Sequence, residues 1–169
     1  MGSCDNLGDF EKALDDTAAE IRLINYFTHH LGTTKHKVLV LFYCVKFALK
    51  LIARGIKHDN SKYGKKEAKY FMPEIHLLKT LDYGSDEYKE SLARIGPGIE
   101  HHYKANRHHP EHFDGGINGM SLIDLIEMFM DWKAATKRTK NGDITKSIDH
   151  NAQRFSIGSV LANIMKNGE

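Results

Sequence analysis

The sequence predicts an all-α protein, and three observations support that class. Apolar residues recur at spacings of three and four along most of the chain, as they do on one face of a helix. Helix signals separate these stretches, such as Ser121 followed three residues later by Asp124, which resembles a capping box. No stretch shows the strict alternation of a half-buried strand. The 169 residues are therefore expected to form a single domain, with a core over about residues 35–137 and a flanking helix at each end.

The expected helices follow one another with short breaks. They span residues 9–31, 35–54, 62–73, 86–96, 99–105, 121–137 and 151–166. Gly32-Thr33-Thr34 is expected to end the first helix, and Gly96-Pro97-Gly98 to interrupt the fourth. Ser61 would cap the third, in which Glu67 is expected to be exposed. Residues 106–119, rich in His, Gly and Pro, are expected to form a loop.

Composition and charge exclude several classes of protein. The content of 41% hydrophobic and 27% charged residues is that of an ordinary globular domain. A net charge of +2 is too small to indicate a nucleic-acid partner. The longest apolar segment, Val38–Ala53, contains Lys46 and Lys50 and is shorter than a membrane span, so no membrane partner is expected. Cys4 and Cys44 have no metal or redox spacing, and the N-terminus lacks a signal peptide, which favours a cytoplasmic location.

Histidines and carboxylates form the candidate site. Five of the eleven histidines lie between residues 101 and 112. His58 and Asp59 are adjacent, and imidazole and carboxylate are both good ligands for a divalent cation. His36 begins the buried helix that precedes them. Asp131 follows apolar residues on a later helix, where a carboxylate is costly to bury unless a cation or partner compensates it.

The order His36, His58-Asp59, Asp131 resembles that of the HD-domain superfamily of metal-dependent phosphohydrolases. The resemblance covers about residues 36–136 and implies a helical bundle with one or two metal ions at its centre. The string His58-Asp59-x-x-Lys62 is similar to one found in HD-GYP cyclic-dinucleotide phosphodiesterases and in the mixed-valent di-iron oxygenases of the superfamily.

A second stretch, residues 108–115, resembles the His-His-Glu-x-x-Asp-Gly sequence of HD-GYP proteins. Pro110 inserts one residue before Glu111, and Gly116-Ile117-Asn118-Gly119 stands where the Gly-Tyr-Pro signature would be. Nearly the whole chain also resembles a family of phage and bacterial proteins with no known reaction. That likeness implies a bacterial cell or a phage-infected host as the location.

The ligand chemistry leads to an expected set of residues for each of two ions. The first ion is assigned to His36, His58, Asp59 and Asp131. The second is assigned to Asp59 as a bridge, His102 and His109, with His101 and His108 as the alternatives. His102 and His109 are seven residues apart and would share a helix face if the helix continued. Iron, manganese, cobalt, nickel and zinc all accept these ligands.

These residues predict a metal-dependent phosphoric ester hydrolase that uses a metal-bound hydroxide. Two ions ~3.5–4 Å apart can activate water and stabilise charge on phosphoryl oxygens. Lys62 would contact the phosphate or the leaving oxygen. Glu111 or Glu127 would orient a ligand histidine or act in proton transfer, and Asp59 completes the expected catalytic residues. The expected substrate is a small phosphorylated molecule such as a nucleotide.

Two other functions suit the same residues. One is a di-iron oxygenase of the HD type, and the other is a non-catalytic phage protein that binds a nucleotide. Monomer and homodimer are both compatible with the sequence.

Overall fold

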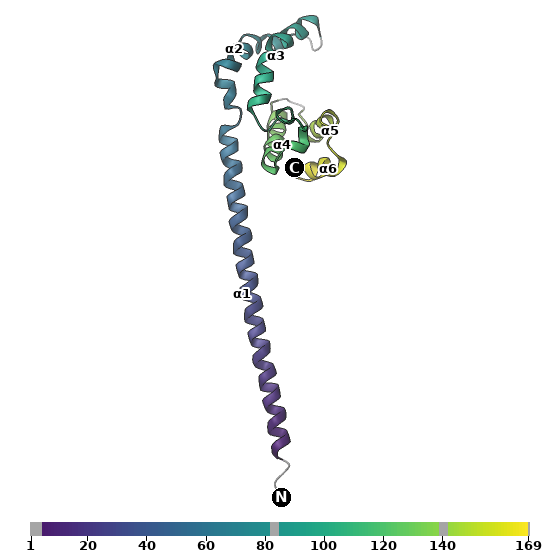
Figure 1. The fold of residues 1–169 in the computed structure, drawn as a ribbon. Coiled ribbons are helices and arrows are strands. Elements are labelled where there is room, and N and C mark those ends of the chain that lie inside the picture. Colours follow the sequence, from purple (N-terminus) through teal and green to yellow (C-terminus); the bar gives the residue numbers. More distant parts are fainter. Residues whose placement is uncertain (1–4, 82–84, 139–141, 169) are drawn as a thin grey trace. The chain divides into compact units, whose positions relative to one another are not determined.

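The computed structural model describes residues 5–81, 85–138 and 142–168, and the regular secondary structure in this part of the chain is helical (Figure 1). Within those residues six α-helices and four short 3₁₀ helices occur and no strand, which confirms the predicted all-α class. The chain forms two compact units, Met1–Leu49 and Lys50–Glu169. The prediction of one domain across residues 1–169 stays a prediction. No helix in the described residues has a stretch long and apolar enough to cross a membrane.

Helix α1, Asp5–Lys57, makes up the first unit and enters the second. The predicted break at Gly32-Thr33-Thr34 is wrong, because the helix continues through all three residues. Glycine costs a helix interior about 1 kcal/mol relative to alanine, and threonine less. Because helix propagation is cooperative, long stretches of good helix formers on both sides can carry a helix through such a weak point.

The second unit begins with the end of α1 and continues through three helical segments. These are η1 (Asn60–Tyr63), α2 (Lys65–Glu74) and η2 (Leu77–Lys79). Gly64, rather than the predicted Ser61, is the N-cap of α2.

Helix α3, Asp86–Ala105, packs against α2 and contains Pro97 without a break. The predicted interruption at Gly96-Pro97-Gly98 is therefore wrong. A Cβ atom on Gly98 would lie 3.0 Å from the Cβ of Tyr70, so this glycine allows α2 and α3 to approach closely.

The rest of the unit forms its apolar core. The segments are η3 (Pro110–His112), η4 (Gly116–Gly119), α4 (Leu122–Thr136), α5 (Ile144–Arg154) and α6 (Ser159–Asn167). The predicted Ser121–Asp124 capping box is present at the start of α4. Met128 and Ile148 are almost fully buried at the centre of the core. The single predicted last helix is divided into α5 and α6, since Ser156 has a φ of 54° between them.

Candidate metal centre

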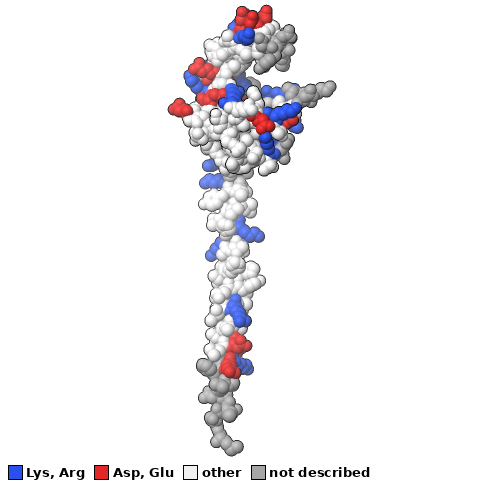
Figure 2. Space-filling view, turned by 90° about the vertical axis from the view of Figure 1, so that its right-hand side faces the viewer, with Lys and Arg blue, Asp and Glu red and all other residues white. Residues whose placement is uncertain are grey.

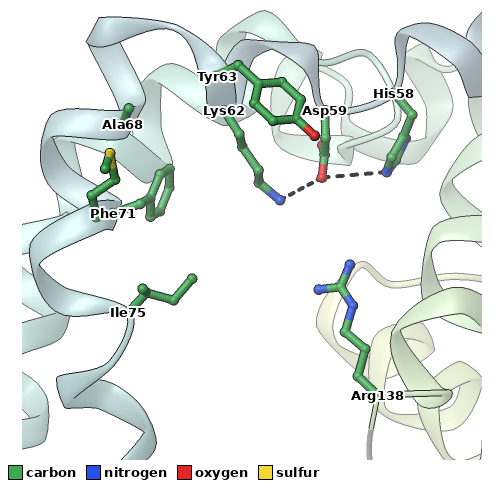
Figure 3. A pocket seen from close by; sticks show the side chains of 9 residues that line it. His58, Asp59, Lys62, Tyr63, Ala68, Phe71, Ile75 and Arg138 are labelled. Carbon is green, nitrogen blue, oxygen red and sulfur yellow. Dashed lines mark hydrogen bonds and ion pairs between the residues drawn. The ribbon is translucent and has the colours of Figure 1, made fainter.

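His58 and Asp59 lie where the chain turns sharply after α1. Asp59 has φ 57° and ψ 14°, a left-handed conformation that aspartate tolerates better than most residues. Figure 3 shows the Asp59 carboxylate between the side chains of His58 and Lys62. Its Oδ2 atom lies 3.6 Å from His58 Nε2 and 2.6 Å from Lys62 Nζ.

Asp59 and three histidines form the first group of possible metal ligands, with one ligand atom of each lying within 4.8 Å of the others: Asp59, His102, His108 and His109. Asp59 Oδ1 is 3.3 Å from His102 Nε2 and 3.4 Å from His108 Nε2. The Nε2 atoms of His102 and His109 are 2.9 Å apart. Helix α3 supplies His102, and the short loop after it returns the other two histidines to the same place.

The polar atoms of this group fit a cation. Asp59 Oδ1 and His108 Nε2 are buried and have no hydrogen-bond partner among the described residues, although such atoms are nearly always paired. A carboxylate oxygen and several imidazole nitrogens form a donor set that divalent transition metals accept. A buried His/Asp group in this protein could therefore hold a metal ion.

The second group of possible ligands contains His58, His108 and Asp131, so it shares His108 with the first. Asp131 projects from α4, and its Oδ1 atom lies 3.4 Å from His58 Nε2. The rings of His58 and His108 have centroids 4.2 Å apart. Three ligands leave room for further ligands on a bound ion, as is usual at catalytic metal sites.

Two buried carboxylates contact the Nδ1 atoms of the histidines, on the side of each ring opposite the Nε2 atom that a metal ion would use. His58 Nδ1 donates to Glu127 Oε1 at 3.1 Å, and His102 Nδ1 lies 3.0 Å from Glu67 Oε2. A carboxylate on Nδ1 fixes the tautomer that leaves Nε2 free as a ligand. Glu127 also lies 3.4 Å from His108 Nδ1. Glu127 thus contacts two of the possible ligands, while its role in orienting a histidine or in proton transfer stays a prediction.

Glu67 is a candidate site residue that sequence reasoning missed. It was expected on the exposed side of its helix, but it is fully buried and also accepts a hydrogen bond from His101 Nδ1 at 2.8 Å. Its position three and four residues before Tyr70 and Phe71 puts it on the side of α2 that meets α3. That spacing was the signal that could have identified it.

The surroundings of the site raise the pKa of one candidate histidine and lower the pKa of two others. The hydrogen bond to Asp131 is the main reason that the pKa of His58 is raised to about 9, although burial acts against it. Burial, together with the neighbouring His108 and His102, lowers the pKa of His109 to about 3. The pKa of His108 is also lowered, chiefly by burial.

The two candidate carboxylates are ionised. Burial would raise the pKa of Asp59, but the nearby His102 ring and the hydrogen bond from Lys62 outweigh burial and hold that pKa well below its usual range. Burial likewise opposes ionisation of Asp131, and the hydrogen bond from His58 lowers its pKa. In the first group, the anionic Asp59 therefore faces neutral His108 and His109 nitrogens, which is the state that metal binding requires.

The other predicted site residues belong to neither group of possible ligands. His36 is exposed on α1 in the first unit and belongs to neither group of possible ligands among the described residues, so its role stays a prediction. His101 also belongs to neither group and instead contacts Glu67. Glu111 accepts a hydrogen bond from Arg154 at 2.7 Å.

A pocket of about 610 Å³ opens beside the candidate metal centre, within the second unit (Figure 3). His58, Asp59 and Lys62 line one side of it, and the Arg138 guanidinium points toward them. The remaining wall is mostly apolar: Tyr63, Ala68, Phe71, Met72 and Ile75. The pocket thus combines two cations, possible metal ligands and an apolar surface.

Residues 25–167 match a family of unknown function, DUF5662. The chain belongs to this family. The match includes all the residues of both ligand groups and of the pocket. Neither the curated proteins nor the solved structures gave a significant match.

Proposed function

We propose that this DUF5662 protein is a metal-dependent phosphohydrolase of the HD type, acting on a small phosphoester such as a nucleotide. The main support for the proposal is the pocket, which is lined by the cationic side chains of Lys62 and Arg138 together with His58 and Asp59. An anionic substrate group would be attracted by the two cations to the place where the possible metal ligands meet.

The chain's own residues have separate roles in this proposal. Asp59, His102, His108 and His109 would hold one ion. His58 and Asp131 would hold a second, because His108 Nδ1 faces Glu127 and its one remaining nitrogen can serve only a single ion. Bound ions of this kind lower the pKa of water and stabilise charge on phosphoryl oxygens.

Lys62 and Arg138 bind the phosphate, because cations that are already oriented stabilise the charge that develops during transfer. The Lys62 side chain is 45% exposed, so it can reach a substrate while it remains near Asp59. Phe71 and Ile75 on the apolar wall would contact the organic part of the substrate and shield it from water. Glu127 and Glu67 position the histidines.

The test combines metal analysis with turnover. Protein prepared with manganese, iron or cobalt is assayed against mononucleotides, cyclic nucleotides and an aryl phosphate. We expect Lys62→Ala to keep its metal content and to lose about 100-fold in kcat/KM. The matched control is Lys104→Ala, which removes a lysine that also pairs with a carboxylate but is 72% exposed on α3; it should behave as the wild type.

A second variant tests the metal centre itself. Asp59→Asn removes the charge that both ligand groups face, so metal content and turnover should fall together. Hydrolysis of no substrate with any of the three metals would overturn the proposal. Consumption of oxygen by the iron-loaded protein in place of hydrolysis would assign an oxygenase instead.

A further inference from the structure

Helix α1 carries large apolar side chains that no described residue of its own unit covers. Ile24, Phe42 and Leu49, for example, are 63%, 57% and 61% exposed. The whole helix has 53 residues and is therefore about 80 Å long. Helices are stabilised in proteins mainly by packing of an apolar face, so a helix of this composition needs a partner.

One set of apolar residues in α1 follows a heptad repeat, while others, such as Leu39 and Leu41, lie off it. Twelve positions alternate in spacing between three and four residues: Leu14, Thr17, Ile21, Ile24, Thr28, Leu31, Lys35, Val38, Phe42, Val45, Leu49 and Ile52. Nine of the twelve are apolar. A repeat sustained over this length is the pattern of a coiled-coil seam. We call these twelve residues the α1 seam.

The α1 seam is symmetric about the level of Thr33. Its positions form pairs equidistant from that residue: Leu14 and Ile52, Thr17 and Leu49, Ile21 and Val45, Ile24 and Phe42, Thr28 and Val38, and Leu31 and Lys35. A second copy of the helix that runs in the opposite direction would thus meet seam positions along the whole length. Gly32 and Thr34 flank the seam at its midpoint, and no other atom lies within 4 Å of a Cβ built on Gly32, so two helices can approach closely there.

Charge favours the same antiparallel direction. The acidic side chains in the described part of α1 lie towards its N-terminal end, and basic ones follow along the rest of the helix (Figure 2). Residues 11–31 contain four acidic residues and two basic ones: Glu11, Asp15, Asp16, Glu20, Lys12 and Arg22. Residues 35–50 contain four basic residues and no acidic one: Lys35, Lys37, Lys46 and Lys50. Antiparallel copies bring unlike halves together, whereas parallel copies would place like charges side by side.

We propose that two copies of this chain associate through an antiparallel coiled coil formed by the α1 seam. About 100 Å² of apolar surface covered at each of nine seam residues gives about 900 Å² per copy, above the ~800 Å² per partner of a standard stable interface. The pairing is two-fold symmetric and closed, as most homodimers are. It involves neither ligand group, so it is independent of the proposed enzymatic function.

The first experiment measures the mass of the full chain in solution by light scattering and sedimentation. We expect twice the chain mass of 19.2 kDa. Val38→Glu places a charge in the seam and should weaken dimerisation at least about 100-fold, since a buried unpaired charge costs several kcal/mol. Val40→Glu is the matched control, because Val40 is also exposed but lies on the side of the helix away from the seam. It should leave the dimer intact.

The second experiment determines direction by disulfide crosslinking in a background with Cys4→Ser and Cys44→Ser. An antiparallel seam requires Ile24→Cys and Phe42→Cys to crosslink when the two variants are mixed, and neither variant to crosslink with itself. A monomeric wild type at every accessible concentration, equal loss of dimer in Val38→Glu and Val40→Glu, or self-crosslinking of Ile24→Cys would each overturn the proposal. Circular dichroism of each variant confirms that it has folded.

Discussion

Replacing Asp124 by asparagine should destabilise the second unit by about 2–3 kcal/mol. The Asp124 side chain is fully buried and accepts hydrogen bonds from Arg54 at 2.8 Å and from Arg107 at 3.2 and 3.0 Å. A hydrogen bond to a charged group is worth about 1 kcal/mol more than one between neutral groups. Three such bonds give about 3 kcal/mol, and the two from Arg107 count for less because that side chain is 49% exposed. The asparagine amide would also match the Ser121 donors poorly, which increases the destabilisation by at most ~1 kcal/mol.

Urea denaturation followed by fluorescence measures this loss. The single tryptophan, Trp132, packs against the core of the second unit and reports its unfolding. Asp149→Asn is the matched control, because Asp149 is 56% exposed and pairs with Lys166 at 2.6 Å; it should cost less than ~1 kcal/mol. Equal destabilisation by the two variants would refute the argument from burial.

The pH dependence provides a second check on Asp124. Burial alone would raise the pKa of this carboxyl, but hydrogen bonds from Arg107 and Ser121 outweigh it and lower that pKa. A lowered pKa in the folded state means that the carboxylate stabilises the fold above its ordinary pKa of 3.8. That contribution is lost as the pH falls through the folded-state pKa. The gap between wild type and Asp124→Asn should therefore narrow below pH 3.8, and a gap that widens there would contradict the assignment.

Two further predictions concern metal binding by protein first stripped with a chelator. Because the pKa of His58 is raised to about 9, His58 is protonated at neutral pH, and an ion bound there with Asp131 must displace that proton. Calorimetry in buffers of different ionisation enthalpy should detect about one proton released on metal binding. The metal affinity of this site should rise with pH up to about 9. Metal binding that is independent of pH and releases no proton would contradict this prediction. Glu127→Gln weakens the contacts to the Nδ1 atoms of His58 and His108 and should lower metal affinity by about 10–100-fold. Glu100→Gln, at an exposed glutamate, is the control and should leave metal affinity unchanged. Unchanged affinity in Glu127→Gln would show that this carboxylate does not support the ligands.

Local chemistry was enough to predict several elements. The Ser121–Asp124 capping box depends on residues three apart, and the structure contains it. The predicted breaks at Gly32-Thr33-Thr34 and Gly96-Pro97-Gly98 were wrong because the context of a residue overrides its propensity. The first three residues lie in a long cooperative helix. In the second stretch, Gly98 lies where α3 approaches α2, and a glycine is needed for that contact.

The candidate site was only partly predictable for a similar reason. His102 and His109 would share a helix face only if the helix continued past Ala105, whereas residues 106–119 were expected to form a loop, and α3 does end at Ala105. Their Nε2 atoms still lie 2.9 Å apart because the chain turns back after Asn106. The loop conformation, rather than a helical spacing, brings these two rings together.

The sequence by itself determined the helical class and the kinds of donor atom available, because periodicity, capping and ligand chemistry depend on residue types and short spacings. Only the tertiary structure decided which of the many acidic side chains support the histidines. Glu67 and Glu127 lie 35 and 69 residues from His102 and His58, and their burial depends on how α2 and α4 pack. A side chain that looks solvated in the sequence becomes part of a site when packing removes its water and leaves a histidine as its hydrogen-bond partner.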